Sequence, residues 1–193
     1  MEHATVRQKE IIAAALGIIN ERGLESLTMK NIAQRVGFSD AAVYRHFQSK
    51  AYILSAMVDS FAGSSIRELK RIKAGSASGL EQIKQFFLDR CRTFATDRAL
   101  ATVMFAEDLF KSEPALAAKI NGAMHDHHRL LLKSIRQGQR QGLLKALPPE
   151  HLFTMVMGSL RLLVLQWQVG HYGFELPRAG EKLWHSLETL IGK

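Results

Sequence analysis

Residues 28–50, which read TMKNIAQRVGFSDAAVYRHFQSK, form the segment that most constrains the fold of this chain. Apolar residues in its first half follow the spacing of a short amphipathic helix: Met29, Ile32, Ala33 and Val36. A turn at 37–39 interrupts this spacing, and Ala42, Val43 and Phe47 then supply the apolar face of a second short helix. Two short helices around a glycine-containing turn form a helix-turn-helix, whose second helix can enter a DNA major groove.

Helical periodicity continues through the rest of the chain. Four prolines occur in 193 residues, and no run alternates apolar and polar residues as a half-buried strand does. The spacing predicts a first helix that Gly23 closes in the left-handed conformation, while Thr28 and Ser39 cap the next two helices. A fourth helix is expected from about 49, and others at about 80–96, 99–110, 115–140, 149–170 and 178–191. We therefore expect an all-α fold of about nine helices.

The whole-chain composition limits the functional classes. A net charge of +8 and a sequence pI near 9.8 favour a polyanionic partner. The single cysteine, Cys91, excludes an internal disulfide and is typical of a reducing cytoplasm. The polar N-terminus does not read as a secretory signal, and the apolar stretch 155–169 is short for a membrane span and carries Arg161. We expect a soluble, cytoplasmic protein with no membrane partner.

The run GLESLTMKNIAQRVGFSDAAVYRHFQSKAYIL resembles the DNA-binding domain of the TetR (tetracycline repressor) family of bacterial transcription regulators. The matching residues cover roughly the first 55 positions: Gly23, Thr28, Ile32, Ala33, Val36, Gly37, Ser39, Val43, Tyr44, His46, Phe47, Ser49, Lys50 and Leu54. The resemblance implies a helix-turn-helix domain at 1–50 and a larger helical effector-binding and dimerisation domain at 51–193. It also implies a ligand-responsive repressor that binds a pseudo-palindromic operator in double-stranded DNA as a homodimer and is released by a small-molecule effector.

Residues expected at the DNA follow from the same resemblance and from their chemistry: Thr28, Lys30, Ser39, Asp40, Ala41, Tyr44, Arg45, His46 and Lys50. Hydroxyl, phenol, imidazole and ammonium groups bind phosphate oxygens, and Thr28 and Ser39 are also expected as helix caps. Arg45 is the candidate for reading guanine, with a phosphate contact as the alternative. Asp40 departs from the family pattern, and either accepts from a cytosine amino group or complements the helix dipole. Residues 1–50, the expected DNA-binding head, carry seven Lys/Arg and five Asp/Glu. Because the net charge of this head is only +2, its basic side chains must cluster in order to bind DNA.

Residues 155–169 are apolar around nearly the whole helix and need cover on more than one side. A second copy of the chain supplies that cover in the four-helix interface that the resemblance implies; the alternative is a core helix within one subunit. Expected interface residues are Met155, Ser159, Leu162, Leu163, Gln166, Trp184 and Leu187.

Aromatic and sulfur-containing side chains in the middle of the chain suggest an effector pocket, although such residues usually form plain core. The candidates are Phe87, Cys91, Phe94, Met104, Phe105, Asp108, Met124 and His128. An inward carboxylate at Glu107 or Asp108 would need a cationic ligand or a hydrogen-bond donor. The histidines at 125, 127 and 128 lack the spacing of a metal site and are expected at the surface, and the basic segment 66–73 either lies near DNA or is a solvated face.

Two other functional classes compete with the regulator. A small metal-dependent hydrolase would need a nucleophile with a spaced base, or a full ligand set, and the sequence shows neither. We expect no enzyme activity, no cofactor and no metal. A basic helical DNA-binding protein without effector control is the second alternative, and it predicts little discrimination between DNA sequences.

Overall fold

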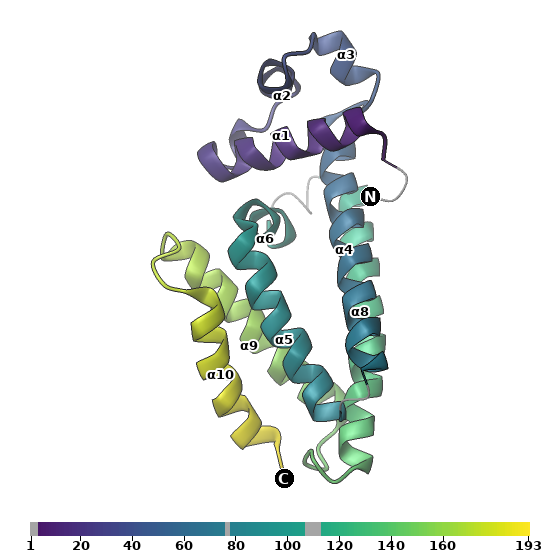
Figure 1. Ribbon diagram of the computed structural model, residues 1–193, viewed down its shortest axis with the longest axis vertical. Helices are drawn as coiled ribbons and strands as arrows, with labels where there is room; N and C mark the ends of the chain where they lie inside the picture. The colour runs from purple at the N-terminus through teal and green to yellow at the C-terminus, as the bar shows by residue number, and fades with distance from the viewer. Residues whose placement is uncertain (1–3, 76–77, 107–112) are drawn as a thin grey trace. The chain divides into compact units, whose positions relative to one another are not determined.

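The computed structural model describes residues 4–75, 78–106 and 113–193. Within these residues it contains nine α-helices, one short 3-10 helix and no strand longer than an isolated bridge between Leu144 and Gly192. The helices are α1 (Val6–Arg22), α2 (Met29–Val36), α3 (Asp40–Tyr44), α4 (Lys50–Ala74), α5 (Gly79–Thr96), α6 (Arg98–Met104), α8 (Pro114–Arg140), α9 (Pro149–Val169) and α10 (Leu176–Ile191), with the 3-10 helix at Leu24–Ser26 (Figure 1). The all-α prediction is confirmed.

The chain packs into two compact units. Unit 1 comprises residues 1–63 and 98–122, and unit 2 comprises residues 64–97 and 123–193. The long helices α4 and α8 each supply residues to both units. The functional division into 1–50 and 51–193 stays a prediction.

Unit 1 is built around the apolar faces of α1 to α4. Ile11, Ile18, Ile32, Val43 and Leu54 are all fully buried in its core. The apolar spacing of residues 28–50 thus serves to pack α2 and α3 against α1 and α4, and leaves their polar residues outside.

Three polar caps fix where the first helices of unit 1 begin. The hydroxyl of Thr28 accepts a hydrogen bond from the backbone N–H of Asn31 (3.1 Å), and that of Ser39 accepts from Ala42 (3.2 Å), as predicted. Thr5 forms a capping box with Gln8 at the start of α1.

The prediction for Gly23 was wrong in detail. Its φ of 83° is positive, but its ψ of 170° is extended, so α1 does not end in the left-handed helical conformation. Gly37 does adopt that conformation, with φ 72° and ψ 29°, and it closes α2.

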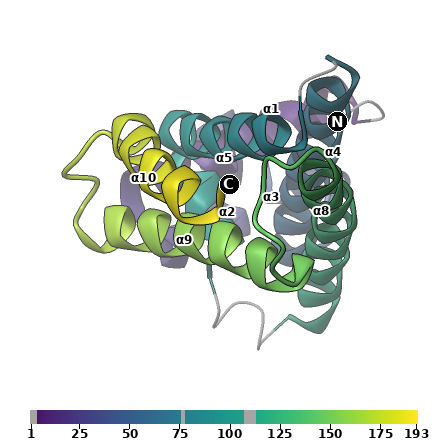
Figure 2. The same ribbon diagram turned by 90° about the horizontal axis from the view of Figure 1, so that it is seen from below.

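Unit 2 is a bundle in which α5 packs against both α9 and α10 (Figures 1 and 2). The rings of Phe87 on α5 and Trp184 on α10 lie 5.5 Å apart. At Gly180 of α10 an added Cβ would lie 2.6 Å from Sγ of Cys91, so this crossing depends on glycine. A second cluster, formed by Leu69, Phe86 and Leu131, joins α4, α5 and α8.

Candidate DNA interface and effector region

The turn between α2 and α3 sets the direction of α3, the helix predicted to enter a DNA major groove. Gly37 donates its backbone N–H to the carbonyl of Ala33, and Phe38 donates to the same oxygen at 3.0 Å. Ser39 then caps α3. The φ of Gly37 is accessible to glycine at little cost, so the chain reverses within three residues. The two helices of the motif are thereby held in one fixed relation.

Burial of Val43 and Phe47 decides which side of α3 faces solvent. Val43 is fully buried and Phe47 is 8% exposed. The residues predicted at the DNA are mostly exposed as a result: Thr28, Lys30, Ser39, Asp40, Ala41, Tyr44 and Arg45, with His46 and Lys50 half-buried. Their contact with DNA stays a prediction.

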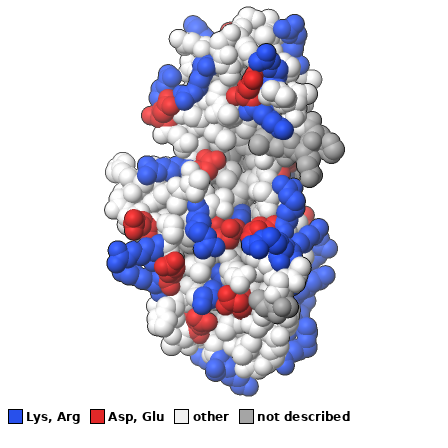
Figure 3. All heavy atoms as spheres, in the orientation of Figure 1, with Lys and Arg blue, Asp and Glu red and all other residues white. Residues whose placement is uncertain are grey.

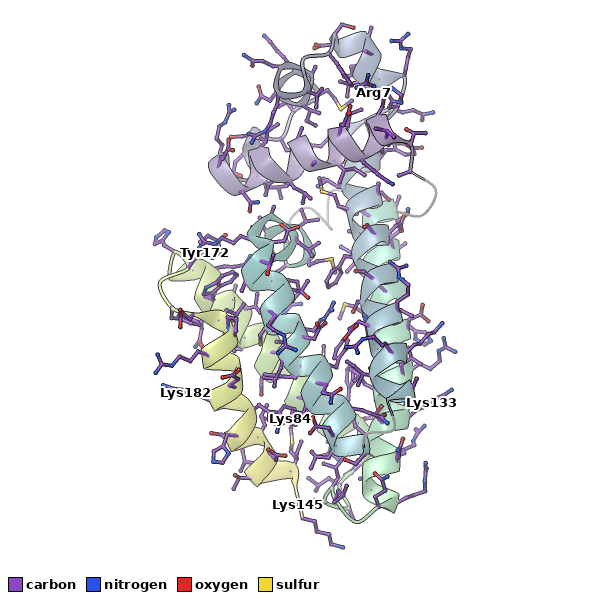
Figure 4. All side chains as sticks on the ribbon, viewed as in Figure 1. Arg7, Lys84, Lys133, Lys145, Tyr172 and Lys182 are labelled. Atoms are coloured by element: carbon purple, nitrogen blue, oxygen red, sulfur yellow. The ribbon has the colours of Figure 1, made fainter. Side chains whose placement is uncertain are left out.

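The charged residues of unit 1 divide into paired and unpaired groups. Arg35 donates to both carboxylate oxygens of Glu21 at 2.6 Å, and this hydrogen bonding lowers the pKa of Glu21 and raises that of Arg35. Arg7 pairs with Glu10 and lies 5.2 Å from the ring of Phe38 at the start of α1 (Figure 4). Within the described part of residues 1–50, the cations outside any ion pair are Lys9, Arg22, Lys30, Arg45 and Lys50.

One exposed aromatic side chain of this head escaped prediction. Tyr52 is 57% exposed in the first turn of α4, two residues after Lys50. An exposed phenol beside a lysine is a further candidate phosphate donor. Its sequence signal was its position directly before Ile53 and Leu54, which take the inner face of α4.

The predicted effector residues fall into different environments. Phe87, Cys91 and Phe94 are buried along α5, and burial raises the pKa of the Cys91 thiol to about 12. Met104 and Phe105, in unit 1, are half-buried.

Two further predicted effector residues, Met124 and His128, lie at the surface of unit 2. Met124 is 53% exposed, and its place in a pocket stays a prediction. His128 is occupied at the surface, where Nε2 lies 2.5 Å from Oε2 of Glu150 and its ring meets that of Phe153 edge-on. Glu107 and Asp108 lie outside the described residues.

The buried histidine of unit 2 is His127, which sequence reasoning placed at the surface. Its Nε2 lies 2.6 Å from Oγ of Ser65 inside the unit. Arg90, 5% exposed, is paired with Asp89 and stacks over Phe86, whose ring also lies 5.5 Å from His127. Burial, reinforced by the positive charge of Arg90, lowers the pKa of His127 to about 4, so the imidazole is neutral at physiological pH.

A sequence signal for His127 exists in the spacing of α8. The buried residues of that helix recur at four-residue intervals, at Ala123, His127 and Leu131. On α10, the indole N–H of buried Trp184 has no acceptor among the described residues. Unit 2 thus contains a guanidinium, an imidazole and an indole donor within an apolar interior.

The last two helices carry an apolar face that the subunit leaves exposed. Met155, Leu162, Leu165 and Val169 of α9 and Leu190 of α10 are 46%, 55%, 46%, 71% and 66% exposed. Of the predicted interface residues, Gln166 is also exposed, and Ser159 and Leu163 are half-buried.

Trp184 and Leu187 present almost no surface to a partner, being 2% and 5% exposed. Both pack inside the subunit, and their assignment to an interface stays a prediction. The sequence prediction did not include exposed Leu165 and Val169. The seven-residue repeat of 155, 162 and 169 was a signal for Val169.

No group of three His, Cys, Asp or Glu side chains in the described ranges is arranged to hold a metal ion. Among the described residues one helix, α9, is long and apolar enough to cross a membrane by length and composition, and 28% of its apolar window is buried. Core helices of soluble proteins meet the same criterion.

Two family models match the chain. Residues 11–57 match bacterial regulatory proteins of the tetR family, and residues 60–189 match the C-terminal region of the YsiA-like protein, a TetR-type model. Among curated relatives, the fatty acid metabolism regulator protein of Bacillus subtilis is 24% identical over 192 residues, covering 99% of this chain and 97% of the relative. The nucleoid occlusion factor SlmA of Vibrio vulnificus is 28% identical over 190 residues, covering 96% and 95%.

Solved structures share the fold over nearly the full length. The fatty acid degradation regulator FadR of Bacillus halodurans matches with a TM-score of 0.83 and 22% identity, covering 95% of each chain. FadR of Bacillus subtilis in complex with stearoyl-CoA matches with a TM-score of 0.79 and 22% identity, covering 93% of this chain and 96% of the other.

Proposed function

The chain belongs to the TetR family of bacterial regulatory proteins, and we propose that it is a dimeric repressor released from its operator by an amphipathic, anionic effector. Its function as a DNA-binding transcriptional regulator follows from the family. The dimer, the DNA-contacting residues, the effector class and a cytoplasmic location are parts of the proposal.

The observation that supports a dimer is the exposed apolar face of α9 and α10. Met155, Leu162 and Val169 repeat at seven-residue spacing, which is the pattern of helices that pack on partner helices. Leu190 of the neighbouring helix extends the same kind of surface. Soluble monomers rarely leave such a patch open, because exposed apolar area is costly in water. A second copy covers it by forming a four-helix interface.

A double substitution tests this interface. Leu162→Glu with Leu165→Glu places two carboxylates in the proposed contact, and light scattering after gel filtration should show a monomer. Leu147→Glu, at a position 37% exposed outside α9 and α10, is the matched control and should remain a dimer. A double variant that stays dimeric contradicts this interface.

At the DNA, Tyr44 and Lys50 are proposed to hold the phosphate backbone and Arg45 to read a base edge. A dimer presents two such heads to major grooves one helical turn apart, so the operator is expected to be pseudo-palindromic. Selecting bound sequences from a random DNA pool tests this arrangement. If the enriched sequences contained a single half-site and no inverted second copy of it, binding of the operator by a dimer would be contradicted.

The proposed effector combines a long apolar chain with an anionic group, as a fatty acyl thioester of coenzyme A does. Buried Phe86 and Phe87 can pack against the apolar chain of the effector. Arg90 and the indole N–H of Trp184 can donate hydrogen bonds to its anionic or carbonyl oxygens. The similar solved structure bound to stearoyl-CoA and the similar fatty acid metabolism regulator protein support this class. Effector binding would favour a state with lower operator affinity, to the extent that the ligand prefers that state.

Fluorescence anisotropy on the selected operator tests the effector. Acyl-CoA molecules of increasing chain length should release the DNA, whereas free coenzyme A should not. Arg90→Met should weaken release at least tenfold without changing operator affinity in the absence of ligand. The second candidate, a DNA-binding protein without effector control, is favoured by the full-length match to a nucleoid occlusion factor. It predicts no release by any chain length.

A further inference from the structure

The positive charge of this chain lies mainly outside its DNA-reading head. The residues of unit 2 include sixteen Lys/Arg and nine Asp/Glu, a net charge of +7, while those of unit 1 include ten and nine, a net charge of +1. A head with almost no net charge gives little sequence-independent attraction to phosphate. Most of the surplus positive charge of the chain therefore lies in unit 2, outside the helix-turn-helix.

Four of these cations lie along one line on α8. Arg129, Lys133, Arg136 and Arg140 follow the i, i+4, i+7, i+11 spacing of a single helix face, and all four are exposed. Buried residues of the same helix, such as Leu131 and Ser134, take the opposite face. Lys133 extends outward from α8 in Figure 4. Eleven residues of helix span about 16 Å, so the charges form an extended row.

The neighbouring half of α4 adds a second row. Arg67, Lys70 and Arg71 are exposed there, on the side away from buried Leu69 and Ile72. The two helix segments lie side by side in Figures 1 and 2. A hydrogen bond between Ser65 of α4 and His127 of α8 joins them. Figure 3 shows Lys and Arg side chains along this edge of the unit.

Few of these charges are neutralised within the subunit. Asp126 pairs with Arg129, and Glu68 pairs with Arg71. Within the described ranges, the remaining cations of the two rows have no carboxylate partner: Arg67, Lys70, Lys133, Arg136 and Arg140. The local field is felt by Lys73, whose pKa is lowered by burial and by the charge of Lys133. We call these five residues the basic face.

We propose that the basic face of unit 2 is a second, sequence-independent DNA-binding surface that contacts the phosphates of duplex DNA. Duplex DNA carries about one charge per 1.7 Å of axis, so about nine phosphates lie within the length of the α8 row. Lys and Arg in such a row bind phosphate without reading bases.

The composition of the face favours DNA over other anionic partners. Exposed Ser64 and His125 precede the two rows, and the rows themselves include no exposed aromatic ring. Membrane-surface helices combine cations with apolar side chains that enter the lipid, and protein interfaces centre on buried aromatic residues. A purely cationic row matches a uniformly charged polymer, and DNA is the polymer on which this family of proteins works.

The experiment separates the basic face from the head. Tyr44→Ala with Lys50→Ala disables the head, and Lys133→Gln, Arg136→Gln and Arg140→Gln are then added to neutralise the α8 row. The matched control adds Arg178→Gln, Lys182→Gln and Lys193→Gln, which remove the same charge from exposed positions elsewhere in unit 2. Binding to a fluorescent random-sequence duplex is measured by anisotropy between 50 and 200 mM salt.

The Tyr44→Ala, Lys50→Ala protein should bind the duplex at 50 mM salt. Neutralising the α8 row should lower its affinity for the duplex at least tenfold. The slope of log affinity against log salt should fall by about 2.7 for three lost phosphate contacts, while the control changes affinity less than twofold. Equal loss in row and control variants, or no binding by the head-disabled protein, would overturn the proposal. If the protein bound phosphatidylglycerol vesicles more tightly than the duplex, and if neutralising the α8 row weakened that vesicle binding, the proposal would be overturned and the face would instead bind a membrane surface.

The row variant with an intact head shows that folding and operator reading survive. Its circular dichroism should match that of the parent protein, and its preference for operator over random DNA should be equal or higher, because only the sequence-independent part is lost. Loss of that preference would overturn the separation of the two surfaces.

Discussion

Buried His127 makes the stability of unit 2 fall below neutral pH. The pKa of its imidazole is about 4 in the folded protein, because burial and nearby Arg90 disfavour the charged form, against 6.5 in the unfolded chain. A depressed histidine pKa means that the unfolded state binds the proton first. The stabilising contribution is therefore complete above pH 6.5 and is lost as the pH falls toward 4.

Those two pKa values give the size of the effect. Between pH 7.5 and pH 5.0, linkage from this single group lowers the free energy of unfolding by about 2 kcal/mol. The carboxyl groups of Glu21 and Glu68 have pKa values lowered below 4.5 by their arginine partners, so they add little in this window.

Urea unfolding followed by circular dichroism at pH 7.5 and pH 5.0, at one fixed protein concentration, measures this difference. His127→Gln removes the titrating group but keeps a polar side chain opposite Ser65. On acidification, the fall in the free energy of unfolding should therefore be smaller in this variant than in the parent protein, by at least 1.5 kcal/mol as linkage requires. His125→Gln, at an exposed position on the same helix, should behave as the parent does. Equal losses in the parent and His127→Gln would refute the burial argument.

Three further predictions follow from local geometry. A Cβ at Gly79 would lie 2.2 Å from backbone atoms of α8, so Gly79→Ala should cost about 3 kcal/mol in the free energy of urea unfolding. Gly122→Ala, at an exposed helical position with nothing within 4 Å, should instead stabilise by about 1 kcal/mol, and the reverse order would contradict the close helix contact. Arg45→Ala should relax the preference among DNA sequences, whereas Lys50→Ala should weaken binding to matched and scrambled operators alike in anisotropy titrations. Cys91, buried with a pKa of about 12, should react with a thiol reagent at pH 8 only when urea unfolds the protein, and rapid labelling of the folded protein would show that the α5–α10 contact opens.

Local sequence determined the DNA-reading head. Its apolar spacing, the caps at Thr28 and Ser39 and the glycine turn at 37 are signals within a few residues of one another, and the structure has each of them in place. Burial of Val43 then exposes the polar side of α3, as amphipathic spacing implies. Gly23 differed, because its ψ depends on the 3-10 turn that follows and not on α1 alone.

In the larger unit, only tertiary packing decided which residues are inside. The stretch 155–169 is apolar on both sides, so its sequence alone left open which side the subunit buries. In the structure α9 packs against α5 and α10, Trp167 is buried and Leu162 is exposed. His127, not its neighbour His128, became the interior histidine because α4 brings Ser65 to it from 62 positions away. Helix formation and capping are short-range, and the sequence alone determined them. Which face of a helix is buried depends on partners distant in sequence, so only the tertiary structure decided that.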